Sequence, residues 1–476
     1  MKESGFKCLR KVLFHPTPSL GFMLLVVICM MSSCAATPDA DKVLDNPPVT
    51  GAAKVTGPRG ALTAAESREL LKDIGATEAL RRHLTVEQAI AESPLVEGNS
   101  TRMLRDGKQA FSAIFAAIEA AQHHINLEYY ILEDIQWEGK FLSEALIRKR
   151  RQGVDVHVIY DSFGSSNTPP AFFDKLKKGG VKILEFNPIN PLEAKKGYEP
   201  LDRDHRKILV VDGKVAILGG INLSATYQSS GKGKSGAAEG HESDYWHDTD
   251  IEIRGPAVAQ IQKLFALQWT KQKGGALDDS TFYPKLGSQG SELIRMIGST
   301  PDKEIPRYYV TLISAIRSAQ KNIWITAAYF FPTEEQVDDL IAAAKAGIDV
   351  RVIVPDKSDA GLAISMQHKH YSKLLKGGVR LWETHGVVQH SKTVTVDGVW
   401  SVVGSSNIDQ RSVVFNDESD IVIVGEKTAA EMEAIFTQDG TAAEEITLKK
   451  WKKRPIGQKF KDAFMPLWLG MFESSL

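Results

Sequence analysis

Histidine and lysine recur together at two places in the sequence, each time as His-x-Lys followed after four further residues by Asp. The two copies comprise His205, Lys207 and Asp212 in the first half and His390, Lys392 and Asp397 in the second. On a β-strand, side chains two positions apart point to the same face. Each copy can therefore hold an imidazole beside a fixed positive charge. Two such faces brought together would hold one phosphoryl group between two imidazoles.

The chemistry that suits this pairing is displacement at an anionic phosphodiester. Cations and hydrogen-bond donors must offset the charge on its non-bridging oxygens. One neutral histidine can attack phosphorus and form a covalent intermediate, and a second, protonated histidine can give its proton to the leaving alkoxide. Histidine suits both roles because its ordinary pKa is about 6.5. This chemistry requires neither a metal ion nor an organic cofactor.

Four further residues stand at matching places after the two motifs. Asn222 and Asn407 each end a Gly/Ser turn, and their amides can add hydrogen bonds to the phosphate oxygens that the lysines bind. Asp248 and Glu418 follow later in each half. A carboxylate beside an imidazole fixes its tautomer, so these two acids are the candidates to orient the histidines.

An internal repeat must position these residues. AIEAAQHHI (117–125) matches AIRSAQKNI (315–323), and KLKKGGVKILE (175–185) matches KLLKGGVRLWE (373–383), in the same order along the chain. Apolar residues at helical spacing alternate with β-rich runs, Gly-Gly pairs end helices, and Asp-Gly after each motif predicts a β-hairpin. We expect an α/β protein with two lobes related by a pseudo-twofold axis. Each lobe would be a mixed β-sheet flanked by helices, with one active site between the lobes.

The amino terminus has the pattern of an export signal. Positive residues precede an apolar run from Leu20 to Met31, and its length of about 12 residues is too short to span a bilayer of about 30 Å as a helix. The small residues before Cys34 resemble a bacterial lipoprotein signal, in which that cysteine is lipidated. An ordinary signal peptide and an uncleaved anchor are the alternatives. We expect a protein anchored in the cell envelope, and Ala35 in place of Asp favours the outer membrane, facing the periplasm.

These patterns divide the chain into four parts. They are a signal peptide (1–33), a linker (34–65), a first lobe with an amino-terminal helical extension (66–290), and a second lobe with a basic and aromatic tail (291–476). In the tail, residues 449–461 carry seven positive charges and no negative ones, and aromatic residues follow. This composition favours contact with an anionic membrane surface over a helix simply docked on the domain.

Composition excludes several classes of protein. The three cysteines of the 476 residues all lie in the first 34, which excludes a disulfide framework and disfavours cysteine catalysis. The chain has a net charge of −1, and removing residues 1–33, with four positive charges and one negative, leaves −4. Bulk attraction to nucleic acid is therefore disfavoured. The sequence fixes no oligomeric state.

The paired motifs resemble those of the phospholipase D superfamily over about residues 95–440. LEYYILED, DHRKILVVDG and SNIDQRSVVFNDES are similar to the bacterial cardiolipin synthases within it, although Ala328 stands where these usually have proline. The resemblance implies a phosphohistidine intermediate and transfer of a phosphatidyl group to the glycerol hydroxyl of phosphatidylglycerol. His205 would be the nucleophile and His390 the acid, while Asp212 and Asp397 would complete the motif from a structural position.

Three other functions remain as alternatives. Water as acceptor would make the protein a phospholipase D that releases phosphatidic acid. An exported phosphodiesterase or nuclease and a non-catalytic membrane scaffold are further alternatives. Two features near the motifs bear on the substrate cleft: Tyr129, Tyr130 and Tyr329 either line it or pack in the core, and residues 228–243 form either a mobile flap or a plain loop.

Overall fold

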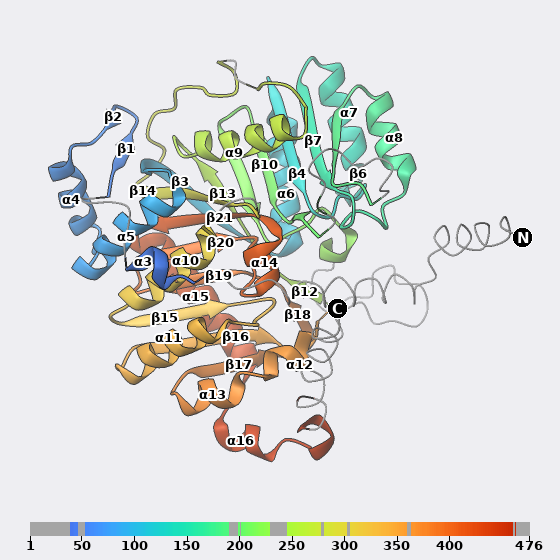
Figure 1. The fold of residues 1–476 in the computed structure, drawn as a ribbon. Helices are drawn as coiled ribbons and strands as arrows, with labels where there is room; N and C mark the ends of the chain where they lie inside the picture. The colour runs from blue at the N-terminus through green and yellow to red at the C-terminus, as the bar shows by residue number, and fades with distance from the viewer. Residues whose placement is uncertain are drawn as a thin grey trace, which may run out of the picture.

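Two α/β lobes make up the body of the protein (Figure 1). The structure is a computed structural model. It describes residues 39–45, 53–189, 199, 201–228, 245–277, 280–301, 305–358, 363–459 and 462.

The first lobe is a mixed sheet with the order β8-β7-β4-β10-β11-β13-β3. Its strands are β3 (Leu95–Arg105), β4 (His124–Tyr129), β7 (Asp155–Asp161), β8 (Lys182–Phe186), β10 (Lys207–Val211), β11 (Val215–Gly219) and β13 (Thr249–Arg254). β4, β7 and β8 pair in parallel, and the other neighbours are antiparallel. Its helices are α6 (Asp106–Ala120), α7 (Leu142–Arg151), α8 (Pro170–Lys178) and α9 (Val258–Lys271).

The second lobe repeats this order as β17-β16-β15-β19-β20-β21-β14. Its strands are β14 (Glu292–Ser299), β15 (Asn322–Thr326), β16 (Asp349–Pro355), β17 (Arg380–Thr384), β19 (Thr393–Val396), β20 (Trp400–Gly404) and β21 (Asn416–Val424), with β22 (Ala443–Ile446) added beside β17. Its helices are α10 (Arg307–Ser318), α11 (Glu334–Lys345), α12 (Ala363–His368), α13 (Tyr371–Lys376), α14 (Gln410–Val414), α15 (Glu426–Ala442) and α16 (Leu448–Lys453). The predicted fold class is confirmed.

β3 and β14 join the lobes, because these two equivalent strands pair antiparallel with each other. The sheets therefore run into one another across the pseudo-twofold axis. Strand β10 shows how both faces are buried: Leu209 and Val211 pack under α6 and α7, while Ile208 and Val210 enter a second core that also contains Met432 of α15. A strand buried on both faces reads as a continuous apolar run, as this one does.

The motif hairpins form as the Asp-Gly pairs predict. β10 pairs with β11, and β19 with β20, across short turns. Asp212 and Asp397 adopt positive φ angles of 53° and 57°, and the glycines after them do the same. Asp and Gly tolerate this left-handed conformation better than most residues.

The amino-terminal extension packs on the second lobe, although it precedes the first lobe in sequence. It includes α4 (Ala64–Asp73) and α5 (Glu78–Ala91), and β1 (Val55–Gly57) and β2 (Gly60–Ala61) from the predicted linker join it. Leu71, Leu80 and Leu84 of its helices share a core with Leu312 of α10 and Trp400 of β20. The extension thus packs against the second strand of the second motif hairpin.

Candidate active site

His205 and His390 stand just before the central strand of each lobe. Lys207 opens β10, and Lys392 immediately precedes β19. β10 has β4 and β11 as neighbours, and β19 has β15 and β20. A strand paired on both sides holds its end rigidly, so each His-x-Lys segment leaves the sheet in a fixed direction.

Each histidine is bound by a carboxylate from the opposite lobe. His205 Nδ1 lies 3.1 and 3.0 Å from the two carboxylate oxygens of Glu418. His390 Nδ1 lies 2.7 Å from Asp248 Oδ2. Both acids are fully buried. With Nδ1 occupied in this way, Nε2 is the nitrogen left for chemistry on each ring. The crossed pairing means that neither lobe can form a complete site alone.

The two motif lysines are buried beside their histidines. Lys207 Nζ donates to the carbonyl oxygen of His205 at 2.6 Å. Lys392 Nζ donates to the His390 carbonyl and lies 3.1 and 3.4 Å from the two nitrogens of its ring. The pKa of Lys207 is lowered to about 7, mainly by burial, while Glu418 opposes this shift and nearby Lys392 reinforces it. A phosphate oxygen beside Lys207 would add a negative charge that favours its protonated form.

His205 is neutral at neutral pH in this environment. Burial lowers its pKa to about 4, an effect that Glu418 opposes and that Lys207 and Lys392 reinforce. A neutral imidazole with Nδ1 bonded to a carboxylate keeps a lone pair at Nε2. That is the protonation state a nucleophile needs.

Arg206 lies between His205 and Lys207 in sequence. Its side chain points away from theirs and contacts residues of both lobes. Its guanidinium donates to Glu128 at 3.1 Å, to the Glu418 carbonyl at 3.1 Å and to the Ser299 carbonyl at 3.1 Å. Glu418 and Ser299 belong to the second lobe. This arginine therefore helps to fix the carboxylate that orients His205.

The two asparagines differ in their surroundings. Asn222 accepts from the Ile131 backbone N–H at 3.1 Å and donates to the Tyr227 hydroxyl at 3.3 Å. Asn407 is buried in a small hollow beside Tyr308. Asn222 is therefore connected through Tyr227 to His390 of the second lobe, whereas Asn407 lies among residues of its own lobe.

The motif aspartates lie at the far end of their strands and bind backbone. Asp212 accepts from the N–H groups of Gln122, His123 and His124 at 2.8–2.9 Å. Asp397 accepts in the same way from residues 320–322. Although the motif groups them with the catalytic residues, both carboxylates fasten a hairpin to the start of the adjacent strand.

We expect Asp212→Ala to cost stability rather than chemistry. Loss of an acceptor for several N–H groups should lower the free energy of unfolding by about 2–4 kcal/mol. Asp212→Asn keeps one acceptor oxygen and tolerates the positive φ angle, so it should lose less. Urea titration and kcat of the folded fraction check both. A kcat lowered a hundredfold at unchanged stability would contradict this role.

Aromatic side chains wall the two imidazoles. The ring of Tyr130 lies 4.9 Å from that of His205, and Tyr227, Trp246 and Tyr329 lie 6.1, 5.1 and 6.2 Å from His390. Tyr129 instead packs in the core of the first lobe. Sequence analysis missed Tyr227 and Trp246, because they flank the insert and belong to no repeated pattern.

His247 clasps the lobes one residue before Asp248. It ends β12 (Tyr245–His247), which pairs with β18 (Val387–Gln389) across the junction visible in Figure 1. Its Nδ1 lies 2.6 Å from Asp106 of the first lobe, and its Nε2 lies 3.1 Å from Asp439 of the second. Its carbonyl oxygen accepts from the His390 N–H at 2.7 Å. Burial disfavours the charged ring, but the hydrogen bonds that it donates to Asp106 and Asp439 outweigh this effect and raise the pKa of His247 to about 9.

This clasp predicts a loss of stability at high pH. Because the folded pKa of His247 lies above the ordinary value of about 6.5, its contribution is complete below pH 6.5 and disappears as pH rises through 9. The shift corresponds to about 3 kcal/mol. Urea midpoints measured from pH 6 to 9.5 should fall, and His247→Gln should flatten that dependence. Parallel curves for both proteins would contradict the assignment.

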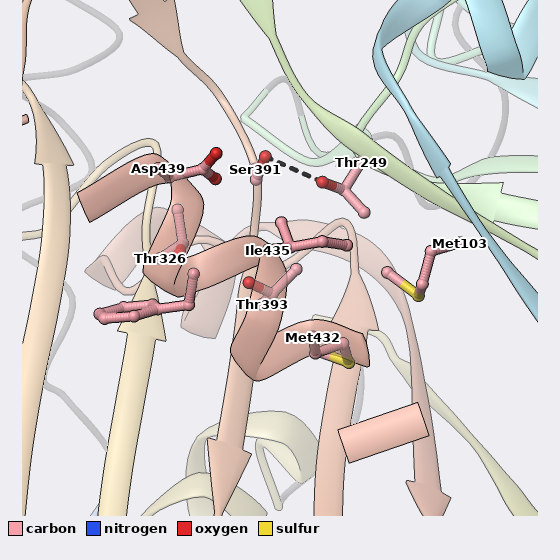
Figure 2. Close-up of a pocket in the computed structure, with 9 residues that line it drawn as sticks. Met103, Thr249, Thr326, Ser391, Thr393, Met432, Ile435 and Asp439 are labelled. Atoms are coloured by element: carbon pink, nitrogen blue, oxygen red, sulfur yellow. Dashed lines mark hydrogen bonds between the residues drawn. The ribbon is translucent and has the colours of Figure 1, made fainter. Parts of the chain in front are cut away.

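A cavity lies between the lobes beside the motif strand (Figure 2). Thr249 and Ser391, the neighbours of Asp248 and His390 in sequence, face it and share a hydrogen bond of 3.1 Å. Met103, Thr326, Thr393, Met432, Ile435, Phe436 and Asp439 complete its lining. The histidines and lysines do not line this cavity, so it is separate from the site of chemistry.

Several expectations fall outside the described residues. The signal peptide, Cys34, most of the insert at 228–243 and the aromatic end of the tail are among them. Among the helices that the structure describes, none is long and apolar enough to cross a membrane.

Comparisons with known proteins agree with the geometry. The family model for "Cardiolipin synthase, PLD-like domain" matches residues 114–232 and 312–440. Cardiolipin synthase 1 of Bacillus cereus is 32% identical over 396 residues, covering 81% of this chain and 75% of that protein. A cardiolipin synthase of Alkalihalophilus pseudofirmus is 31% identical over 396 residues, covering 82% and 75%. Among solved structures, phosphatidylserine synthase of Haemophilus influenzae has a TM-score of 0.60 at 13% identity, over 83% of this chain and 98% of that one.

Two lobes that each give a histidine and a lysine to one site define an enzyme of the phospholipase D superfamily. Both repeats match the family model, one in each lobe. The chain belongs to the cardiolipin synthase family of phospholipase D-like proteins. The likeness to phosphatidylserine synthase adds the shared fold.

Proposed function

We propose that this protein is a phosphatidyltransferase that forms cardiolipin from phosphatidylglycerol through a phosphohistidine. The observation that carries the proposal is the crossed pairing of His205 with Glu418 and His390 with Asp248. It gives two oriented imidazoles, one from each lobe, to a single phosphoryl group. Membership of the cardiolipin synthase family supports the choice of lipid.

In the first half-reaction, Nε2 of His205 attacks the phosphorus of the donor lipid. The P–N bond forms as the P–O bond to the headgroup breaks, and His390 gives its proton to the leaving alcohol. His205 suits the nucleophilic role because burial keeps it neutral. Lys207, Lys392 and the Asn222 amide would hold the non-bridging oxygens.

In the second half-reaction, His390 accepts the proton of the glycerol hydroxyl of phosphatidylglycerol. That oxygen attacks phosphorus, and the P–N bond to His205 breaks. The headgroup leaves before the acceptor reacts, so ping-pong kinetics should result. With water in place of the hydroxyl, the same steps would give phosphatidic acid.

A lipid substrate and the predicted export signal support a location at a membrane surface of the cell envelope. Cys34 would carry the lipid anchor, which incorporation of labelled palmitate tests when Cys34→Ala is the control. Lys449, Lys450, Lys452 and Lys453 of α16 are exposed, and Ile456 beyond them is 79% exposed. Cationic and apolar groups side by side favour an anionic bilayer. Sedimentation with phosphatidylglycerol vesicles should weaken when these lysines become glutamine.

The decisive experiment follows the products of labelled phosphatidylglycerol in mixed micelles. Wild type should release glycerol and form cardiolipin, and His205→Ala should form neither. Phosphatidic acid as the main product would replace the transferase with a phospholipase D. Absence of any lipid turnover, together with cleavage of DNA, would replace it with a nuclease.

A further inference from the structure

Tyr227 occupies a place in the site that the repeat does not duplicate. It lies five residues after Asn222, where the second half has Ser412 five residues after Asn407. Ser412 accepts from the Asn407 backbone N–H at 3.2 Å and stays within its own lobe. Tyr227 instead reaches across the junction to the second histidine.

The backbone holds Tyr227 firmly. It lies in a short 3₁₀ helix, η2 (Ala225–Gln228), and its side chain is 2% exposed. The Tyr227 carbonyl approaches α6 at Gly107 so closely that a β-carbon there would lie 1.9 Å from the oxygen. Glu133 accepts from the Ala225 N–H at 2.8 Å. These contacts fix the direction in which the phenol points.

The Tyr227 hydroxyl contacts both the phosphate side and the proton side of the site. Its oxygen lies 3.1 Å from His390 Nδ1, the nitrogen that Asp248 also binds. It accepts from the Asn222 amide at 3.3 Å. An amide carries two protons, so Asn222 can give one to Tyr227 and the other to a phosphate oxygen.

We propose that Tyr227 is the positioning residue that prepares His390 for proton transfer and links it to the phosphate-binding amide of Asn222. The inference rests on the proposed function for the role of His390 as the proton donor, and not for the identity of the lipid. His390 Nδ1–H faces two acceptors, the Asp248 carboxylate and the Tyr227 oxygen. A second acceptor favours the protonated ring and adds no negative charge beside the phosphate. His205 has both oxygens of Glu418 on its Nδ1 instead.

The other groups around His390 do not supply this effect. Lys392 lies against the ring and disfavours its positive charge. Trp246 and Tyr329 contribute ring contacts at 5.1 and 6.2 Å. Trp246 also packs edge-on against Tyr227, with ring centres 5.3 Å apart. Removal of the Tyr227 hydroxyl alone should therefore leave the pocket shape intact and weaken only the support for the proton.

Tyr227→Phe tests this role, with release of headgroup alcohol as the readout. The headgroup alcohol leaves in the first half-reaction, whether the acceptor is a lipid hydroxyl or water. Its release is measured with the phosphodiester that wild type cleaves fastest. We expect kcat to fall about 30-fold with KM nearly unchanged, the effect of losing a hydrogen bond to a charged group. The basic limb of the kcat profile should move to lower pH by about one unit, because the acid loses its proton more easily.

Tyr371→Phe is the matched control, since Tyr371 is equally buried and its hydroxyl contacts Gln367 and Glu383 in the second lobe. Its kcat profile should match wild type. A kcat loss in Tyr227→Phe with an unmoved basic limb, or a change in thermal stability alone, would overturn the proposal. Failure of wild type to form cardiolipin would overturn the proposed lipid chemistry and leave this comparison valid.

Discussion

Replacing His205 by alanine should abolish turnover, with kcat lowered by about 10⁴-fold or more. The loss is this large because the variant lacks the group that forms the bond to phosphorus. Glu418 is fully buried and bound to His205, and the Ser405 hydroxyl donates to the same carboxylate at 2.5 Å. The expected loss includes substrates with activated leaving groups, since the missing step is bond formation and not protonation. Acid-labile label on the protein should also disappear.

His370→Ala provides a matched control for this result. His370 is a buried histidine away from the motifs. Its exposed fraction is 6%, and it lies beside Glu334 on the second lobe. Its replacement should leave kcat within about threefold of wild type. Substantial turnover by folded His205→Ala would contradict a nucleophilic His205.

Local pattern was enough to predict the motif hairpins and the duplicated order of elements. Asp-Gly between apolar runs determines a turn over a few residues, and strand pairing follows from it. The same holds for the histidine partners, because Asp248 immediately precedes β13 and Glu418 lies in β21, at matching places of the repeat. Sequence could name these acids, but it could not assign each to the histidine of the opposite lobe.

That assignment depends on how the lobes meet, which residues distant in sequence decide. The antiparallel pairing of β3 with β14, the contacts of Arg206 and the His247 clasp all act across the junction. The same reason explains why the amino-terminal helices could not be placed on the second lobe. Their apolar stripe predicts burial, but not the surface that buries it.

Because each histidine is oriented by a carboxylate from the opposite lobe, the active site forms only where the two lobes meet. Any movement that separates the lobes removes Glu418 from His205 and Asp248 from His390 at once. Both imidazoles would then lose their fixed tautomer together. The charged contacts of Arg206 and His247 therefore protect activity as well as stability.

Replacing His390 by alanine should separate the two halves of the reaction. On phosphatidylglycerol, kcat should fall by about 10²–10⁴-fold, because an alkoxide leaves poorly without a proton. On a phosphatidyl p-nitrophenyl ester, one equivalent of nitrophenolate should still appear per active site, since that group leaves without an acid. His205 stays neutral and bound to Glu418 in the variant, so the nucleophile is intact.

After this burst, His390→Ala should stop as a covalent enzyme. The acceptor hydroxyl then has no base to take its proton, and the P–N bond to His205 persists. Rapid quenching at alkaline pH, followed by proteolysis and mass spectrometry, should find the phosphatidyl group on the peptide that contains His205. The mirror variant, His205→Ala, should give no burst and no label. Label on His390 in His205→Ala would show that the two roles are reversed. The two motifs are nearly symmetric, but the partners of the two rings are not. His205 Nδ1 contacts Glu418, whereas His390 Nδ1 contacts both Asp248 and Tyr227, and this difference supports His205 as the nucleophile.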